Sequence, residues 1–158
     1  MTRYGCLLLA GFAGAVQSAT YIDAVDFPTH AHAWNRFLEL EERLVADFGN
    51  LCLDEFCKAG YGRIHPLRYR CSVDSETGVM GECVWVLVGS GQAIDPSSGA
   101  VALKAPVWHC RTPLAEGTRI EDFYQALYAW GGAIYARLPG TDRSIYKGLR
   151  DCLPGTPE

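Results

Sequence analysis

Residues 82–88, with the sequence ECVWVLV, decide the fold of this chain. The stretch holds three valines, a leucine and a tryptophan, and after Glu82 it has almost no polar relief. β-branched and aromatic residues favour strands, and a strand that is apolar on both faces is typically buried within a sheet. Turn-forming residues flank it, with DSETG at residues 74–78 and GSGQ at residues 89–92. We therefore expect residues 82–88 to be the central strand.

Neighbouring segments are expected to pair with this strand as an antiparallel meander. Residues 67–73 (LRYRCSV) alternate in polarity, as a half-buried strand does. After the GSGQ connection, residues 95–99 (DPSSG) predict a second turn. Residues 100–103 and 107–111 then form a third strand that is interrupted at Pro106. The proline predicts a sheet edge or a bulge there, because it cannot donate a hydrogen bond to a neighbouring strand. The sheet is therefore predicted to have three to four strands.

Helices are expected on both sides of the meander in sequence. Apolar residues recur at three- and four-residue steps from Trp34 to Phe48, which predicts an amphipathic helix that begins near Pro28 and ends at Gly49. Near the end of the chain, Thr118 and Glu121 have the spacing of a capping box. A last helix is expected to begin at residue 141 or 142. The order helix, meander, helices indicates an α+β fold.

The first nineteen residues have the layout of a secretory signal peptide. Arg3 gives a positive start, residues 6–16 are apolar, and small residues follow at Ser18 and Ala19. We therefore expect residues 1–19 to be a leader and residues 20–158 to form a single domain in the periplasm or outside the cell. The formal net charge is −4 and no basic patch stands out, which argues against a nucleic-acid partner. No later apolar run is long enough to predict a membrane span.

Removal of the leader would leave an even number of cysteines, as a disulfide framework requires. These are Cys52, Cys57, Cys71, Cys83, Cys110 and Cys152. Strand register leaves two alternatives open, because Cys83 could lie opposite Cys71 in the first hairpin or near Cys110 in the second. The preferred set is Cys52–Cys57, Cys71–Cys83 and Cys110–Cys152, in which the last bridge ties the C-terminal helix to the body.

The usual catalytic and metal-binding patterns are weak in this chain. His30 and His32 have no carboxylate or cysteine cluster to complete a metal site. Gly89-Ser90-Gly91 lacks the pattern of a nucleophile elbow and is interpreted as a hairpin loop. His65 and His109 are the candidate bases if the chain is a small exported hydrolase. No cofactor or metal is expected, and the absence of an active-site pattern favours a binding protein.

In overall plan the chain resembles the periplasmic immunity proteins that bacteria keep against type VI secretion amidase effectors. The features that carry the resemblance are the leader, the size, the six cysteines and polar loops such as residues 89–92. The resemblance implies no catalysis and a protein partner, a peptidoglycan amidase, whose catalytic cleft is plugged by a loop or a sheet edge. A second copy of the chain is the other protein partner considered, and an envelope ligand-binding module is the alternative function.

The expected contact surface lies in the connection after the central strand. Polar and small residues there would be held rigid by the disulfide-stapled sheet, which reduces the entropy lost on binding. The predicted contact residues are Ser90, Gly91, Gln92, Asp95, Ser97 and Ser98, with Trp108 as an aromatic anchor.

Overall fold

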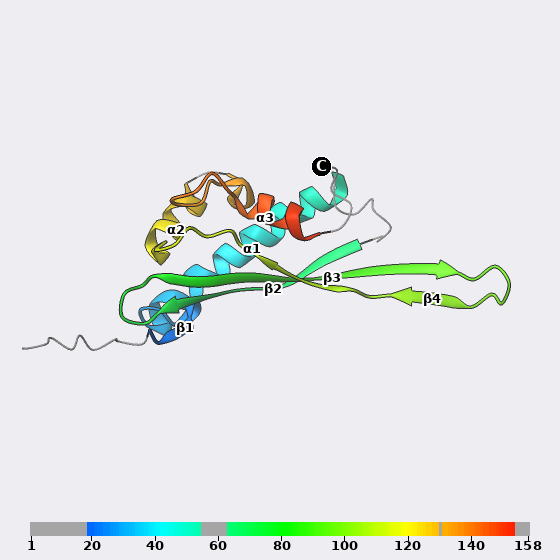
Figure 1. Ribbon diagram of the computed structural model, residues 1–158, viewed down its shortest axis with the longest axis horizontal. Helices are drawn as coiled ribbons and strands as arrows, with labels where there is room; N and C mark the ends of the chain where they lie inside the picture. The colour runs from blue at the N-terminus through cyan, green and yellow to red at the C-terminus, as the bar shows by residue number, and fades with distance from the viewer. Residues whose placement is uncertain (1–18, 55–62, 130, 154–158) are drawn as a thin grey trace, which may run out of the picture.

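The computed structural model describes residues 19–54, 63–129 and 131–153, and Figure 1 shows their arrangement. The predicted leader lies outside the described residues apart from Ala19. The elements in chain order are β1 (Tyr21–Asp23), η1 (Ala24–Asp26), α1 (His30–Asp54), β2 (Arg63–Asp74), β3 (Met80–Ile94), β4 (Val101–Lys104), β5 (Val107–Arg111), α2 (Ile120–Tyr128), η3 (Ala133–Tyr135) and α3 (Ile145–Cys152). The expected α+β fold is confirmed.

Strand β3 is the centre of a five-stranded antiparallel sheet. Along one side it pairs with β2, from Ser90 opposite Arg63 to Met80 opposite Val73. Along its other side it pairs first with β5 and then, further toward its end, with β4. The short strand β1 adds to the far edge of β2, so residues 21–23 belong to the sheet. The prediction that residues 82–88 form the central strand is confirmed, although the strand is longer at both ends.

The two faces of the sheet differ in what covers them. Alternate residues of β3, namely Cys83, Trp85 and Leu87, are buried in one core cluster with residues of all three α-helices, and we call their side of the sheet the inner face. The side chains between them point to the outer face, where Val84, Val86 and Val88 are only half-buried. In Figure 1, α1, α2 and α3 accordingly lie together on one side of the strands.

Aromatic side chains fill the centre of the core. Tyr69 of β2 and Trp85 of β3 stand opposite each other, with ring centroids 5.8 Å apart. Two phenylalanines of α1 complete the group, since Phe48 lies 5.6 Å from Trp85 and Phe37 lies 6.2 Å from Tyr69. The Tyr69 hydroxyl is 2.8 Å from the Thr112 hydroxyl, and burial raises the pKa of Tyr69 far above its ordinary value. The aromatic packing holds α1 against β2 and β3, and the hydrogen bond attaches β2 to the residue that follows β5.

The last helix begins later than predicted. Helix α3 starts at Ile145 and not at residue 141 or 142, because the Ser144 hydroxyl caps it by accepting a hydrogen bond from the Lys147 N–H.

Two other helix boundaries differ from the sequence-based predictions. Helix α1 does not end at Gly49 but continues to Asp54, because Leu51 is buried in the core and favours one more turn of helix. Thr118 and Glu121 do not form a capping box. The Thr118 hydroxyl donates to the Ala115 carbonyl, and Glu121 instead pairs with Arg36 of α1 at 2.8 Å. Tertiary contacts therefore replace the expected local ones.

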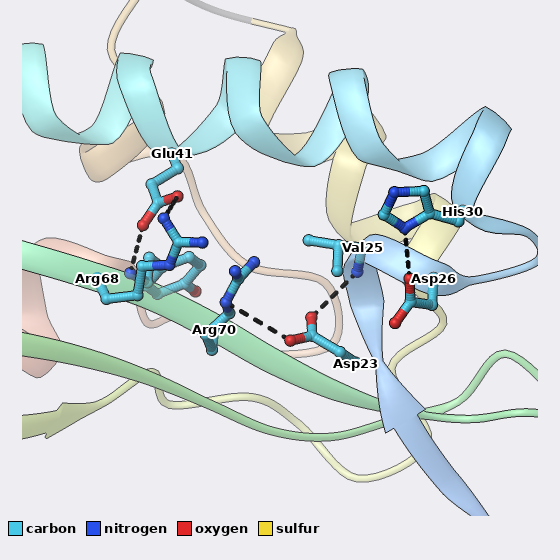
Figure 2. Close-up of polar contacts among 8 residues, drawn as sticks. Asp23, Val25, Asp26, His30, Glu41, Arg68 and Arg70 are labelled. Carbon is cyan, nitrogen blue, oxygen red and sulfur yellow. Dashed lines mark hydrogen bonds and ion pairs between the residues drawn. The ribbon is translucent and has the colours of Figure 1, made fainter.

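A carboxylate of α1 covers the edge of β2 beyond β1. Glu41 is buried, and its Oε1 accepts a hydrogen bond of 2.8 Å from the backbone N–H of Tyr69. Its other oxygen lies 3.7 Å from Arg68 Nη1, as Figure 2 shows. An unpaired N–H at a covered sheet edge would cost free energy. Glu41 thus substitutes for a neighbouring strand at this position.

Two disulfides among the described residues join separate elements of the fold. Cys71 and Cys83 are direct partners across β2 and β3, and Cys110 of β5 is bonded to Cys152 of α3. Both predicted pairs are confirmed, and the register alternative that placed Cys83 beside Cys110 is wrong, because β5 sets Trp85 opposite Cys110. Cys57 lies outside the described residues, so the Cys52–Cys57 pair stays a prediction.

Replacing Glu41 by alanine should destabilise the fold by about 1–3 kcal/mol, because it leaves the buried Tyr69 N–H without an acceptor. Glu41→Gln keeps an acceptor oxygen and should lose less. The exposed Glu39, which pairs with Arg43 one turn away on the same helix, is the matched control. Glu39→Ala should change stability by less than about 0.5 kcal/mol. Urea unfolding of the three variants measures this order, and equal losses for Glu41→Ala and Glu39→Ala would contradict it.

The two disulfides should contribute unequally to stability. Chain entropy in the unfolded state predicts a loss of about 4 kcal/mol when Cys110 and Cys152, 42 residues apart, are both replaced by alanine. The same treatment predicts about 3 kcal/mol for Cys71 and Cys83, which are 12 residues apart. Thermal unfolding of the two double variants under oxidising conditions compares them. A larger loss from the shorter loop would show that packing, not loop closure, sets the difference.

Candidate functional site

The β3–β4 hairpin extends away from the rest of the described chain, as the long pair of strands in Figure 1 shows. We call residues 90–104 the arm. Four consecutive pairs, from Gly91 opposite Lys104 to Ile94 opposite Val101, hold its two strands together. Nearly all of its side chains are exposed. The arm is therefore a surface element that packs little against the described core.

Three of the predicted contact residues lie in a strand and not in a loop. Ser90, Gly91 and Gln92 belong to β3, which continues through residues 89–92 without a turn. The glycine that begins this stretch has a packing role, because a Cβ at Gly89 would lie only 2.6 Å from the Trp108 ring. Glycine within a strand often marks such a close approach. The expectation of a hairpin loop at residues 89–92 is therefore wrong.

Trp108 lies at the base of the arm on the inner face. It stands opposite Leu87 on β5 and is partly buried against the core. Its ring fills the space above Gly89, beside Pro106. Pro106 interrupts the strand as predicted, because it lies between the end of β4 and the start of β5. Its carbonyl still accepts a hydrogen bond from the Gly89 N–H. Trp108 thus supports the arm where it leaves the body.

The remaining predicted contact residues form the turn at the end of the arm. Asp95 Oδ1 accepts hydrogen bonds from the backbone N–H groups of Ser97 and Ser98 at 2.9 and 2.8 Å, and from both of their hydroxyls. Gly99 closes the turn at a φ of +70°, which a residue with a side chain rarely adopts. The structure therefore brings Asp95, Ser97 and Ser98 together, in a turn organised by one carboxylate.

These hydrogen bonds stabilise the charged form of the carboxylate. They lower the pKa of Asp95 to about 2, the Ser97 hydroxyl making the largest contribution. The end of the arm therefore carries a negative charge throughout the physiological pH range.

The arm also carries exposed apolar side chains, which were not among the predicted contact residues. Ile94 is 66 % exposed, Val101 56 % and Leu103 73 %. Ile94 stands opposite Val101, and Leu103 stands opposite Gln92, so all three side chains share the outer face. At the base of the arm Val107, also exposed, stands opposite Val88 and extends the same apolar stripe. The signal that could have predicted this stripe is the alternation in residues 101–104, where Val101 and Leu103 are separated by a small residue.

The histidines considered as catalytic bases are not assembled into a site with other described residues. His65 and His109 stand opposite Val88 and Val86 on the two sides of β3, and both are exposed. Within the described part of the chain neither ring has a hydrogen bond or an ion pair. Cys110, next to His109, is in a disulfide and has no thiolate.

The histidines near the start of α1 make local contacts. The His30 ring lies 2.6 Å from Asp26 Oδ1, as Figure 2 shows, and it packs on Trp34 with centroids 4.6 Å apart. His32 pairs with the Thr29 hydroxyl at 2.9 Å. Among the described residues, no group of three or more histidine, cysteine or acidic side chains is placed to hold a metal ion.

The other charged residues of Figure 2 serve the sheet edge. Asp23 accepts from the Val25 N–H at 3.1 Å through one oxygen and lies 3.5 Å from Arg70 Nε through the other. With the Glu41–Arg68 pair, this contact attaches β1 and α1 to β2. The cluster is therefore explained by the fold.

No described helix is both long and apolar enough to cross a bilayer. Comparison of the chain with protein-family models, curated proteins and solved structures gave no match.

The turn at the end of the arm should depend on the Asp95 carboxylate. Asp95→Ala removes the shared acceptor, and the Ser97 and Ser98 amides should then exchange with solvent faster. Asp95→Asn, which retains one acceptor oxygen, is the matched control. Amide exchange measured by NMR compares the variants, and unchanged protection in Asp95→Ala would refute the role of the carboxylate.

Acid should disrupt the same turn. Because the folded pKa of Asp95 is depressed, its stabilising effect is fully present above the unfolded value, about 3.9, and is lost as the pH falls through about 2. Chemical shifts of the Ser97 and Ser98 amides followed from pH 5 downward report this titration. A midpoint near the ordinary aspartate value would contradict the assigned hydrogen bonds.

Proposed function

We propose that the protein is a non-catalytic binding protein whose arm and adjoining outer face contact a partner protein. The observation that carries the proposal is the set of three apolar side chains, Ile94, Val101 and Leu103, exposed on one face of a projecting hairpin. Contiguous exposed apolar residues commonly mark interaction sites. A hairpin held by four residue pairs and an organised turn loses little entropy when it binds.

An exported location fits the same proposal. Structural disulfides form and persist in oxidising compartments, and two among the described residues join separate elements. Together with the leader predicted at residues 1–19, they support a site of action in the periplasm or outside the cell.

The partner class proposed is the one that the resemblance to immunity proteins implies, a peptidoglycan amidase effector. The mechanism would be steric. The arm consists of two strands and a turn, and an element of this kind would occupy or cover a catalytic cleft. Leu103 would be the central apolar contact, because it is the most exposed of the three. Gln92 would lie beside it, directly opposite on β3, while Asp95 would add a negative charge at the turn, and both would contribute to specificity.

Site-specific photocrosslinking tests this proposal. A benzophenone amino acid at Leu103 should form a covalent adduct with one protein in an envelope extract of the source cells. The same probe at Val45, an exposed position on α1, should not form that adduct. The captured protein should cleave peptidoglycan, and addition of the purified chain should inhibit it. Equal adducts from both positions would show that the arm is not the interface.

Leu103→Asp should weaken binding to the captured protein by about tenfold or more, because it places a charge in an apolar contact. Val45→Asp, a matched change at an exposed site, should bind as the natural chain does. Titration calorimetry measures both, and thermal unfolding checks that neither variant is misfolded. Unchanged affinity in Leu103→Asp would overturn the assignment of the arm as the binding surface.

A further inference from the structure

The outer edge of β4 is a pairing surface. Among the described strands, β4 has a single neighbour, β3. Asp95 N–H donates to the Ala100 carbonyl, so residue 100 directs its backbone groups toward β3. Since these directions alternate along an antiparallel strand, Val101 and Leu103 direct their N–H and C=O groups away from β3. An exposed strand edge of this kind is a template for another strand.

This edge is complementary to itself. If a second copy of β4 lies antiparallel with Ala102 opposite Ala102, then Val101 of each copy stands opposite Leu103 of the other. Those are the residues whose backbone groups point outward, so each such pair exchanges two hydrogen bonds. Directly opposite side chains lie on the same face of a sheet. Val101 and Leu103, both more than half exposed in one chain, would therefore pack side by side on the outer face.

The charges of the arm favour the same arrangement. Within residues 90–104 the only charged side chains are Asp95 at the turn and Lys104 at the base. An antiparallel pair of arms places Lys104 of one copy opposite Ala100 of the other. Asp95 of the other copy is paired with that Ala100, so the opposite charges lie two strands apart and attract each other across the interface. Both charged residues lie on the inner face. Ala93 and Ala102 stand opposite each other on that face. Asp95 and Lys104 each lie two positions further along their strands, which returns the side chain to the same face. A parallel pair would instead place like charges together.

We propose that a second copy of this chain pairs along β4, which joins the two arms into one continuous sheet with the strand order β3-β4-β4-β3. The inference rests on the proposed role of the arm as a protein-binding element and names one occupant of its edge. It leaves the outer face open. Ile94, Val101 and Leu103 of both copies would form a single apolar platform there, and this platform is what an effector would contact.

A cysteine substitution at the two-fold axis is a direct test. Ala102 points its backbone groups toward β3, so the pair Ala102–Ala102 is of the non-hydrogen-bonded kind, with Cα atoms about 4.5 Å apart. That separation lies within the range of a disulfide. Purified Ala102→Cys should therefore form a covalent dimer under mild oxidation. Ala100→Cys, equally exposed but opposite Lys104 of the second copy, is the matched control and should stay largely monomeric.

The natural chain should show a monomer–dimer equilibrium in light scattering that shifts toward dimer as its concentration rises. Lys104→Glu should shift it back toward monomer, because it replaces the attraction to Asp95 of the second copy, two strands away, by a repulsion. A natural chain that is monomeric throughout, with equal crosslinking of Ala102→Cys and Ala100→Cys, would overturn the inference. If the Leu103 probe still captures another protein in that case, the proposed function survives without the dimer. Dimerisation with no captured protein would support the dimer and count against the effector.

Discussion

The pairing of β3 along both of its edges is the constraint on which the rest of the structure depends. This strand is hydrogen-bonded to β2 on one side and to β5 and β4 on the other, over 15 residues. Its alternation places Trp85 in the aromatic core and Val86 on the outer face. One disulfide attaches β2 directly to β3, and the other attaches α3 to β5. Both bridges therefore secure strands that β3 has already placed.

The consequence of this arrangement is a sheet with two different faces and two different ends. The helices cover the inner face of the half that contains Trp85, and Glu41 of α1 closes the adjacent edge of β2. The other half continues beyond the helices as the arm, where the same alternation of side chains exposes Ile94 and Leu103 to solvent. Stability and the proposed binding surface thus occupy opposite ends of one strand. A substitution in the arm should consequently affect binding with little effect on folding.

Much of the fold could be predicted from local patterns. The apolar run at residues 82–88 identified the central strand, and the turn at residues 74–78 set the register that pairs Cys71 with Cys83. Helix ends were less predictable, because tertiary contacts decide them. Leu51 extends α1 past Gly49, and Glu121 pairs with Arg36 and leaves Thr118 to another acceptor. Of the candidate site, the Asp95 turn was located correctly. Residues 89–92 were misinterpreted, because the space that Gly89 leaves for Trp108 depends on a strand more than fifteen residues later.

The arm exists because β3 continues through residues 89–94 as a paired strand. Nuclear Overhauser contacts in the isotopically labelled chain test this continuation. We expect a strong contact between the α-protons of directly opposed residues in the non-hydrogen-bonded pairs, Ile94 with Val101 and Gln92 with Leu103. We also expect slow amide exchange at Ala93, whose N–H points toward β4. Absence of these contacts, with rapid exchange throughout residues 89–104, would show a flexible loop and no continuous strand.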